Sequence, residues 1–302
     1  MYYLIYGLLY LFSLLPFPVL YFISNGLYGL VYYIIGYRKK VVMQNLAIAF
    51  PKKTEAERKE ITKQFYKNFI DSFMENIKMI SISEKEFNRR CTMDITPING
   101  VAAKGKNIHI FTAHLMNWEY ANWMISKNIN LPWVAVYMLI KNKALNRVFF
   151  NIRTKYKAVM IPAQQFKTKM HGIFKSRYSL GIVADQNPAS PGSGYWLYFF
   201  SKPVPFLIGP EKGARMNKAA VIFICPVKSK RGYYHVESKL ITENAAELKE
   251  GELTCLYRDY LEEKISINPD NYLWSHRRWK WEYKNEFKRG WIDKRANSPV
   301  ME

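Results

Sequence analysis

The sequence predicts an α/β protein with a mostly parallel central sheet and helices on its faces. Two observations lead to this prediction. From about residue 101 onwards, short apolar runs typical of buried strands alternate with segments of helical periodicity. Turn-forming residues separate some of them, most clearly in NPASPGSG, residues 187–194. Strands that alternate with helices pair mainly in parallel, because each helix carries the chain back across the sheet. The length of 302 residues is sufficient for one large core and an appended segment.

The first 37 residues contain no Asp, Glu, Lys or Arg, and the basic triplet RKK follows directly. This stretch is long enough to cross a bilayer, although Pro16 and Pro18 divide it. A kinked span, a re-entrant pair and an interfacial hairpin all agree with the pattern. The basic flank favours the cytoplasmic side for everything that follows. We therefore expect residues 1–37 to form a membrane anchor.

The next segment predicts a long helix. Thr54 and Glu57 have the spacing of a capping box at a helix start. Apolar residues then recur every four positions from Ile61 to Ile77. Such a stripe suits a helix that lies on lipid or one that packs on the protein core. We expect the second, because the polar face of this helix is not especially basic.

The remaining elements follow from periodicity and from turn signals. The predicted strands are 107–113, 133–138, 158–161, 179–184, 219–227 and 233–241. The predicted helices are 119–127, 143–156, 164–175 and 246–265.

The stretch IHIFTAHLMNWEYANW, residues 108–123, places His114 and Glu119 five positions apart where an apolar run ends. On a continuous helix or strand these two side chains would diverge. They can meet only if the chain turns from strand to helix between them. That turn would lie at the carboxyl end of a strand, where open α/β sheets carry their chemistry. A histidine held by a carboxylate is a general base for a hydroxyl or a water. A strand-end histidine with a chance neighbour would give the same spacing.

Two further clusters of polar residues follow apolar segments. GIVADQNP delivers Asp185 and Gln186 to a turn after a predicted strand. WSHRRWKWEY places Arg277 and Arg278 between tryptophans. The chain has no glycine-rich phosphate loop, no G-x-S-x-G elbow and no zinc-ligand spacing, so we expect neither a metal nor a cofactor. Its three cysteines are far apart and odd in number, which is not the pattern of a disulfide framework.

The chain is strongly basic, with 45 Lys and Arg against 24 Asp and Glu, a net charge of +21 and a pI near 9.7. Such an excess indicates an acidic partner: a nucleic acid, an anionic membrane or an acidic protein. Nucleic acid is disfavoured because the basic residues are dispersed and no recognition module is present.

His114 and Glu119 match the H-x4-D/E motif of glycerolipid and lipid A acyltransferases. The chain resembles, more narrowly, the late acyltransferases of lipid A biosynthesis, of the lauroyl and myristoyl type. The resemblance runs nearly from end to end. It includes the apolar N-terminal segment, NLAIAFP, HLMNWE, an arginine in the following helix (Arg153), ADQ at a strand end, the pair Phe199-Phe200, and YLWSHRRWK.

The resemblance implies a membrane-bound O-acyltransferase with a glycerolipid acyltransferase-like fold. It would move a fatty acyl chain from a thioester, usually acyl carrier protein, to a hydroxyl of a lipid A precursor. His114 would act as general base with direct attack by the hydroxyl, and Glu119 would orient the imidazole. Asn117, Arg153 or a backbone N–H would stabilise the oxyanion.

Asp185 would pair with Arg153 or Arg278 to build the pocket, next to Gln186. Arg277 and Arg278 suit the phosphates of an anionic glycolipid acceptor.

The resulting domain prediction has three parts. Residues 1–37 are the membrane anchor, 38–100 the helical N-terminal part of the catalytic domain, and 101–302 the α/β acyltransferase core with a basic C-terminal tail. The predicted location is the inner membrane, with the catalytic part on the cytoplasmic face. Two alternatives remain: an acyltransferase for another amphiphile, such as an aminolipid or a glycolipid, and a non-catalytic, basic lipid-binding module at the membrane.

Overall fold

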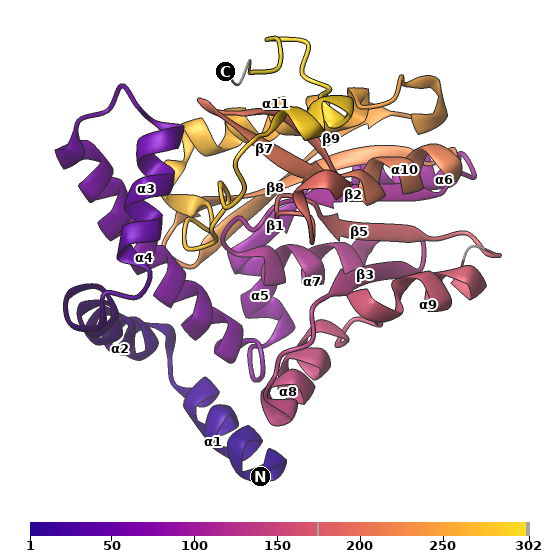
Figure 1. Ribbon diagram of the computed structural model, residues 1–302. Coiled ribbons are helices and arrows are strands. Elements are labelled where there is room, and N and C mark those ends of the chain that lie inside the picture. Colours follow the sequence, from indigo (N-terminus) through magenta and orange to yellow (C-terminus); the bar gives the residue numbers. More distant parts are fainter. Residues whose placement is uncertain (174, 300–302) are drawn as a thin grey trace.

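The computed structural model describes residues 1–173 and 175–299, and its centre is a seven-stranded sheet (Figure 1). The strand order is β1-β9-β8-β2-β5-β3-β4, and only β8 and β9 pair antiparallel. The prediction of a mostly parallel sheet is therefore confirmed. The strands are β1 (Cys91–Met93), β2 (Ile108–Thr112), β3 (Trp133–Tyr137), β4 (Val159–Pro162), β5 (Ser179–Val183), β8 (Ala220–Lys230) and β9 (Tyr233–Thr242).

Helices cover both faces of the sheet, so its central strands are apolar on both sides. Along β8, Val221, Phe223 and Cys225 belong to one buried cluster, whereas the alternate residues belong to the other. One face carries α5 (Glu84–Arg90), α6 (Thr96–Ala103), α7 (Trp118–Asn128) and α8 (Lys143–Arg153). The other carries α10 (Ile208–Met216) and α11 (Glu252–Ile267). Helix α3 (Lys39–Ala49) packs on α4 (Glu55–Lys78) and binds the C-terminal segment through Asn45, and α9 (Phe166–Ile173) lies near β4.

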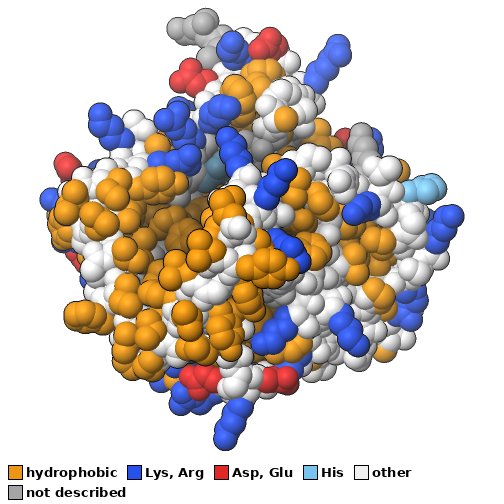
Figure 2. Space-filling view, turned by 90° about the horizontal axis from the view of Figure 1, so that it is seen from below, with side chains coloured by type: hydrophobic (Ala, Val, Ile, Leu, Met, Phe, Trp, Pro, Cys, Tyr) orange, Lys and Arg blue, Asp and Glu red, His pale blue; other side chains and the backbone are white. Residues whose placement is uncertain are grey.

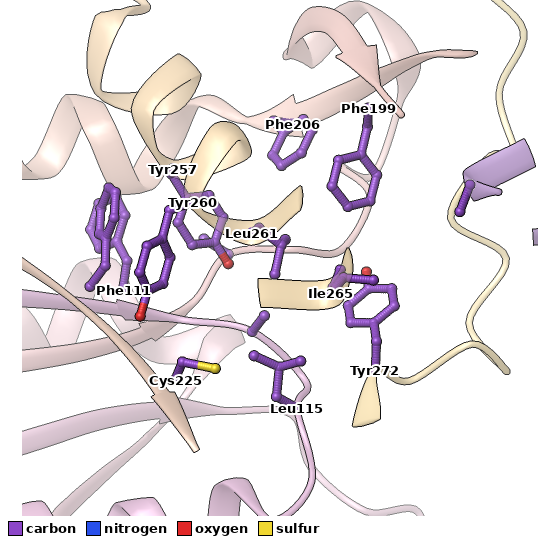
Figure 3. Packing of buried hydrophobic residues seen from close by; sticks show 14 of the residues in the cluster. Phe111, Leu115, Phe199, Phe206, Cys225, Tyr257, Tyr260, Leu261, Ile265 and Tyr272 are labelled. Atoms are coloured by element: carbon purple, nitrogen blue, oxygen red, sulfur yellow. The ribbon is translucent and has the colours of Figure 1, made fainter. Parts of the chain in front are cut away.

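The cluster under α11 also supports the loops that follow the strands (Figure 3). Tyr257 and Tyr260 of α11 pack edge-on or tilted against Phe223 of β8. Leu115, the residue after His114, belongs to the same buried cluster and forms a bridge with Tyr272. The packing of α11 thus fixes the chain on both sides of the loop that carries His114.

A second, two-stranded sheet stands beside the first. Its strands are β6 (Gly194–Phe199) and β7 (Lys202–Leu207), which pair antiparallel. This hairpin is absent from the predicted elements, because Pro203 and Pro205 disfavour a central strand. The proline positions are tolerated in a hairpin with only one partner strand for each member. The C-terminal segment packs on it, with Trp196 bridged to Trp291.

The N-terminal segment forms α1 (Tyr2–Leu14), α2 (Phe17–Gly29) and a short π-helix, η1 (Leu30–Ile35). Pro16 separates α1 from α2, as its missing N–H and fixed φ predict. Among the described residues, one continuous helical stretch, Phe17–Ile35, is long and apolar enough to cross a membrane, with a mean hydropathy of 1.3. In Figure 1 α1 and α2 lie at one corner of the molecule, beside α4 (Glu55–Lys78).

Helix α4 begins with the predicted capping box, in which Thr54 and Glu57 satisfy each other's backbone N–H. Its apolar stripe packs on the core only in part: Phe65 is fully buried, whereas Phe73 is 45% exposed. The predicted helix 246–265 begins later, at Glu252, because Gly251 stands at its start with a positive φ. The 3₁₀ turns are Ala163–Gln165, Pro191–Ser193, Ala245–Glu247, Pro269–Asn271 and Asn285–Gly290.

Candidate active site

His114 and Asp185 meet at the carboxyl edge of the sheet. His114 follows β2, Asp185 follows β5, and these two strands are parallel neighbours. Nδ1 of His114 lies 2.8 Å from Oδ1 of Asp185. The Asp185 carboxylate is buried, whereas the His114 side chain keeps 22% exposure. A carboxylate accepts only, so Nδ1 carries the proton and Nε2 of the neutral ring is left with a free electron pair.

The second ring nitrogen of His114 also has a partner. Gln186 places its Nε2 at 3.3 Å from Nε2 of His114, where the amide N–H donates to the unprotonated ring nitrogen. The Trp118 ring packs edge-on against the imidazole, with 5.3 Å between centroids. His114 is therefore held in one orientation, and part of its side chain remains exposed. This is the arrangement of a general base that is ready to accept a proton.

Glu119 is expected beside His114, but the structure places it elsewhere. Its carboxylate accepts from Nε of Arg153 at 3.0 Å and from Nη2 at 2.5 Å. It also accepts from Nε1 of Trp118 at 3.2 Å. Burial disfavours charge on Arg153, yet the neighbouring Glu119 carboxylate outweighs it and the pKa of Arg153 is raised. Glu119 thus reaches the imidazole only through Trp118, and Asp185 takes the contact that the spacing assigns to Glu119.

Asn117 is buried and forms the N-cap of α7. Its Oδ1 accepts from the backbone N–H groups of Glu119 and Tyr120, at 3.1 and 3.4 Å. Its Nδ2 donates to Glu75 of α4, which is itself fully buried. The observed contacts of Asn117 therefore hold the helix start, and its role as a substrate ligand stays a prediction.

The segment 271–278 encloses the site from the C-terminal side. Backbone N–H of Leu273 donates to the carbonyl oxygen of His114 at 3.0 Å, and that of Met116 donates to Asn271 at 3.0 Å. The loop after β5 is tied to the same segment, because Asn187 Nδ2 donates to the carbonyl of Arg277 at 2.8 Å. Two stretches singled out in the sequence, ADQN and WSHRR, are therefore neighbours in space.

The two adjacent arginines of this segment have different surroundings. Arg277 is exposed, whereas Arg278 is fully buried. Nη1 of Arg278 donates to Oδ1 of Asn187 at 2.6 Å and to the carbonyl of Pro205 at 3.0 Å. Its guanidinium lies 4.3 Å from the centroid of the Phe206 ring. The pairing of Arg278 with the phosphate of an acceptor would require its exposure, so only Arg277 is placed for such a contact in this structure.

Electrostatics favour an ionised carboxylate next to His114. Burial alone would raise the pKa of Asp185, but the positive charge of His114 when its ring is protonated, the hydrogen bonds from His114 and the charge of Arg278 outweigh it, and the pKa is lowered. Asp185 therefore stays anionic and holds the proton on Nδ1 of His114. Desolvation, helped by the positive charge of Arg278, lowers the pKa of His276 to about 4, so this neighbouring ring is neutral near pH 7.

Figure 2 shows a hollow on the face that carries α1 and α2, lined by hydrophobic side chains, with histidine atoms visible at its inner edge. Lysines and arginines stand around this apolar surface. Among the described residues, no group of three or more His, Cys, Asp or Glu side chains is arranged to hold a metal ion.

Comparisons with known proteins agree with the motifs of this site. The family model described as bacterial lipid A biosynthesis acyltransferase matches residues 1–281. The chain belongs to this family. It is 24% identical over 279 residues to a lipid A biosynthesis lauroyltransferase of Escherichia coli K12, covering 91% of this chain and 89% of that protein. It is 20% identical over 276 residues to a lipid A biosynthesis palmitoleoyltransferase of the same organism, with 91% and 89% covered. A Shigella flexneri lipid A biosynthesis acyltransferase is similar to the same extent, at 20% identity.

The protein is thus an acyltransferase, and the family assignment made from its motifs is confirmed. Sequence reasoning places both His114 and Asp185 at strand ends but assigns Asp185 to an arginine. The signal that would have joined them is the parallel form of the two strand endings, Thr-Ala-His and Val-Ala-Asp, at residues 112–114 and 183–185. Sequence reasoning also misses Trp118, whose ring and N–H connect this acyltransferase's His114 to Glu119.

Proposed function

We propose that the acyltransferase moves a fatty acyl chain from acyl carrier protein to a hydroxyl of a lipid A precursor, with His114 as general base. The observation that carries this proposal is the 2.8 Å contact between Nδ1 of His114 and Asp185. It leaves Nε2 unprotonated, on a side chain that lies at the edge of the sheet and is 22% exposed. The names of the relatives, a lauroyltransferase and a palmitoleoyltransferase, support a fatty acyl group and a lipid A acceptor.

In the proposed reaction the acceptor hydroxyl displaces the Gln186 amide from Nε2 of His114. Nε2 takes the hydroxyl proton while the oxygen attacks the thioester carbon, which gives a tetrahedral oxyanion. The oxyanion collapses, the carbon–sulfur bond breaks, and the leaving thiolate takes the proton back from the imidazolium. No protein nucleophile is needed. Asp185 stabilises the imidazolium that forms between the two proton transfers, which is the role of the carboxylate in a Ser-His-Asp triad.

Other residues of the site have supporting roles in this proposal. Arg153, which Glu119 holds through three hydrogen bonds, would stabilise the oxyanion with its guanidinium. Arg277, which is exposed beside the site, would bind a phosphate of the acceptor. The apolar hollow in Figure 2 suits the acyl chains of donor and acceptor.

The charge of the chain supports the proposed partners and location. Acyl carrier protein, a phosphorylated glycolipid and the inner leaflet are all anionic, and the net charge of +21 attracts each of them. The apolar residues 1–37 attach the enzyme to the inner membrane, and the basic cluster after them favours the cytoplasmic face for the catalytic part.

A transfer assay in detergent tests this proposal. It uses acyl carrier protein donors of several chain lengths and two acceptors, a lipid A precursor and a hydroxylated aminolipid. His114→Ala is expected to lose activity by roughly 10²–10⁴-fold, whereas His171→Ala, at an exposed position of α9, should keep it. Transfer to the aminolipid alone would overturn the acceptor and keep the chemistry. Wild-type rate in folded His114→Ala would overturn the general-base assignment.

A further inference from the structure

The inner face of α2 and η1 carries a row of aromatic rings. They stand at spacings of four, seven and four residues, which places them on one side of a helix. Every ring of this row meets a positively charged side chain from the body of the protein. The pairs are Phe17 with Arg90 at 3.4 Å, Tyr21 with Arg231 at 4.3 Å, Tyr28 with Lys67 at 5.6 Å, and Tyr32 with Lys39 at 4.0 Å, measured to the ring centroids. Lysine and arginine side chains therefore contact the inner face of α2 and η1 along most of its length.

Hydrogen bonds to buried carboxylates reinforce this row. Ser24 of α2 donates to Oδ1 of Asp71 at 2.6 Å, and Asp71 is 2% exposed. Arg231 binds both oxygens of Asp71, at 2.6 and 2.8 Å, and donates to Oδ1 of Asn25 at 2.9 Å. One turn further along α4, Glu75 accepts from the hydroxyl of Tyr21 at 3.0 Å. Helix α2 is thus tied to α4 by groups that would be unsatisfied without each other.

These contacts conflict with a path of α2 across the membrane. If Phe17–Ile35 crossed the hydrocarbon while packed on α4, the charges of Lys67, Asp71 and Arg231 would enter it as well. Charged side chains and unpaired backbone N–H and C=O groups are not tolerated at that depth unless they are enclosed within protein. Lys78 adds the same conflict at the other end, because its Nζ donates to the carbonyl oxygens of Ser13 and Leu15 at 2.8 and 2.9 Å.

The outer face of the same segment is apolar and unpartnered. Only 17% of the most apolar window of Phe17–Ile35 is buried. Further exposed apolar side chains lie on α1, on α8, which packs against α1, and in the loop between β3 and α8. Figure 2 shows hydrophobic side chains gathered on this face around the hollow. The exposed apolar residues concerned are Met1, Tyr3, Leu4, Leu8, Tyr10, Leu11, Leu14, Val19, Phe22, Leu30, Tyr33, Ile34, Ile35, Met138, Leu139 and Phe150.

We propose that Phe17–Ile35 lies in the plane of one leaflet and does not cross the bilayer, with Met138 and Leu139 as a second point of insertion. The partner is a lipid surface with anionic headgroups. It meets the apolar outer face, and the surrounding lysines and arginines in Figure 2 meet the headgroups. The exposed tyrosines of the first 37 residues, Tyr3, Tyr10, Tyr33 and Tyr37, suit this depth, because each combines an apolar ring with a hydroxyl that water can reach. This inference rests on the proposed membrane attachment, but not on the identity of the acceptor.

The orientation is tested with the full chain bound to vesicles of anionic and zwitterionic phospholipid, with a short protease-cleavable tag placed before Met1. Vesicles whose bound protein faces outward are identified by impermeant-thiol labelling of Lys52→Cys. Helix α2 in the plane keeps the tag on the same side, so protease removes it without detergent. A tag that is protected until detergent is added overturns the proposal.

The packing of α2 on α4 in the bound state has its own measurement. Ser24→Ala should lower the unfolding temperature of the vesicle-bound protein, because Asp71 then loses the hydroxyl that α2 donates to it. An unchanged temperature would mean that α2 leaves α4 on binding, which also overturns the proposal.

The second insertion point is tested by Leu139→Glu. The matched control is Met216→Glu on α10, which lies far from α1 and α2 (Figure 1). Loss of one inserted leucine should weaken vesicle binding by about tenfold, and the control should not weaken it. Equal effects would overturn the role of the loop. Transfer assays on the same samples separate this inference from the function: a protected tag with full transfer defeats only the in-plane orientation, and a cleaved tag without transfer to any acceptor defeats only the proposed function.

Discussion

His114 and Asp185 stand at equivalent positions on neighbouring strands. Thr112 of β2 pairs with Val183 of β5, and each chain continues for two further residues before it presents its polar side chain. The register that aligns the strands therefore also aligns imidazole and carboxylate, which meet at 2.8 Å. Because both residues leave a sheet that is buried on its two faces, their relative position is set by the core and not by a mobile loop.

Asp185→Asn is the first prediction from this geometry. An asparagine at this position can donate to Nδ1, which moves the ring proton to Nε2 and removes the base. We expect kcat to fall by about 10³-fold or more, as for the equivalent change in a Ser-His-Asp triad. Steady-state transfer assays measure this, and thermal unfolding checks that the fold is kept. Recovery of a measurable part of the rate in Asp185→Glu would support a role in orientation, whereas a normal rate in Asp185→Asn contradicts it.

The second prediction concerns Glu119 and Arg153 as one unit. Their side chains are mostly buried and share three hydrogen bonds, so either single change leaves an unpaired charge. Glu119→Gln and Arg153→Gln should each lower kcat and destabilise the protein by about 1–3 kcal/mol. The double variant should have a kcat and a stability no lower than those of the more damaged single variant, because the same ion pair is lost in all three proteins. Effects on transfer that simply add would show that the two residues act independently.

The sequence predicts the elements of this site better than its contacts. Strands, their order along the chain and the polar residues at their ends follow from periodicity, because each depends on neighbours within a few residues. The pairing of β2 with β5 does not, because two strands of the same sheet lie between them in the chain. Glu119 is five residues from His114 and Asp185 is 71 residues away, yet Asp185 is its partner. The Trp118 ring packs against the imidazole, its N–H donates to Glu119, and the Glu119 carboxylate binds Arg153.

Arg277 and Arg278 give the third prediction, because the structure separates two residues that the sequence treats alike. Arg277→Ala should raise KM for a phosphorylated acceptor, leave KM for an uncharged one unchanged, and keep the thermal stability. Arg278→Ala should lower stability by about 2 kcal/mol or more, since it removes charged hydrogen bonds to Asn187 and to Pro205. Arg278→Lys is the control, because lysine keeps the positive charge but lacks the planar set of guanidinium donors. An Arg277→Ala variant that loses stability and affinity for both acceptors would contradict this division.

The fourth prediction concerns the dependence of stability on pH, and it depends on buried histidines. Desolvation lowers the pKa of His109 and of His276 from 6.5 to about 4. Between those values the unfolded chain binds more protons than the folded one, so stability rises with pH in this window and is lost as pH falls from 6.5 towards 4. The lowered pKa of Asp185 acts in the same direction, but only below its ordinary value of 3.8.

His109 offers the cleaner test of this prediction, because it is 1% exposed and lies away from the proposed chemistry, with Nε2 at 3.2 Å from the hydroxyl of Tyr178. Its full contribution across the window is about 3 kcal/mol. Urea unfolding at several pH values between about 4.5 and 7 measures the slope for the wild type and for His109→Gln, whose amide can keep a hydrogen bond and does not titrate. We expect the slope of the variant to fall by up to one proton per molecule. The same slope in both proteins would mean that His109 binds a proton in the folded state, and the destabilisation at low pH would then have to come from His276 or from groups elsewhere.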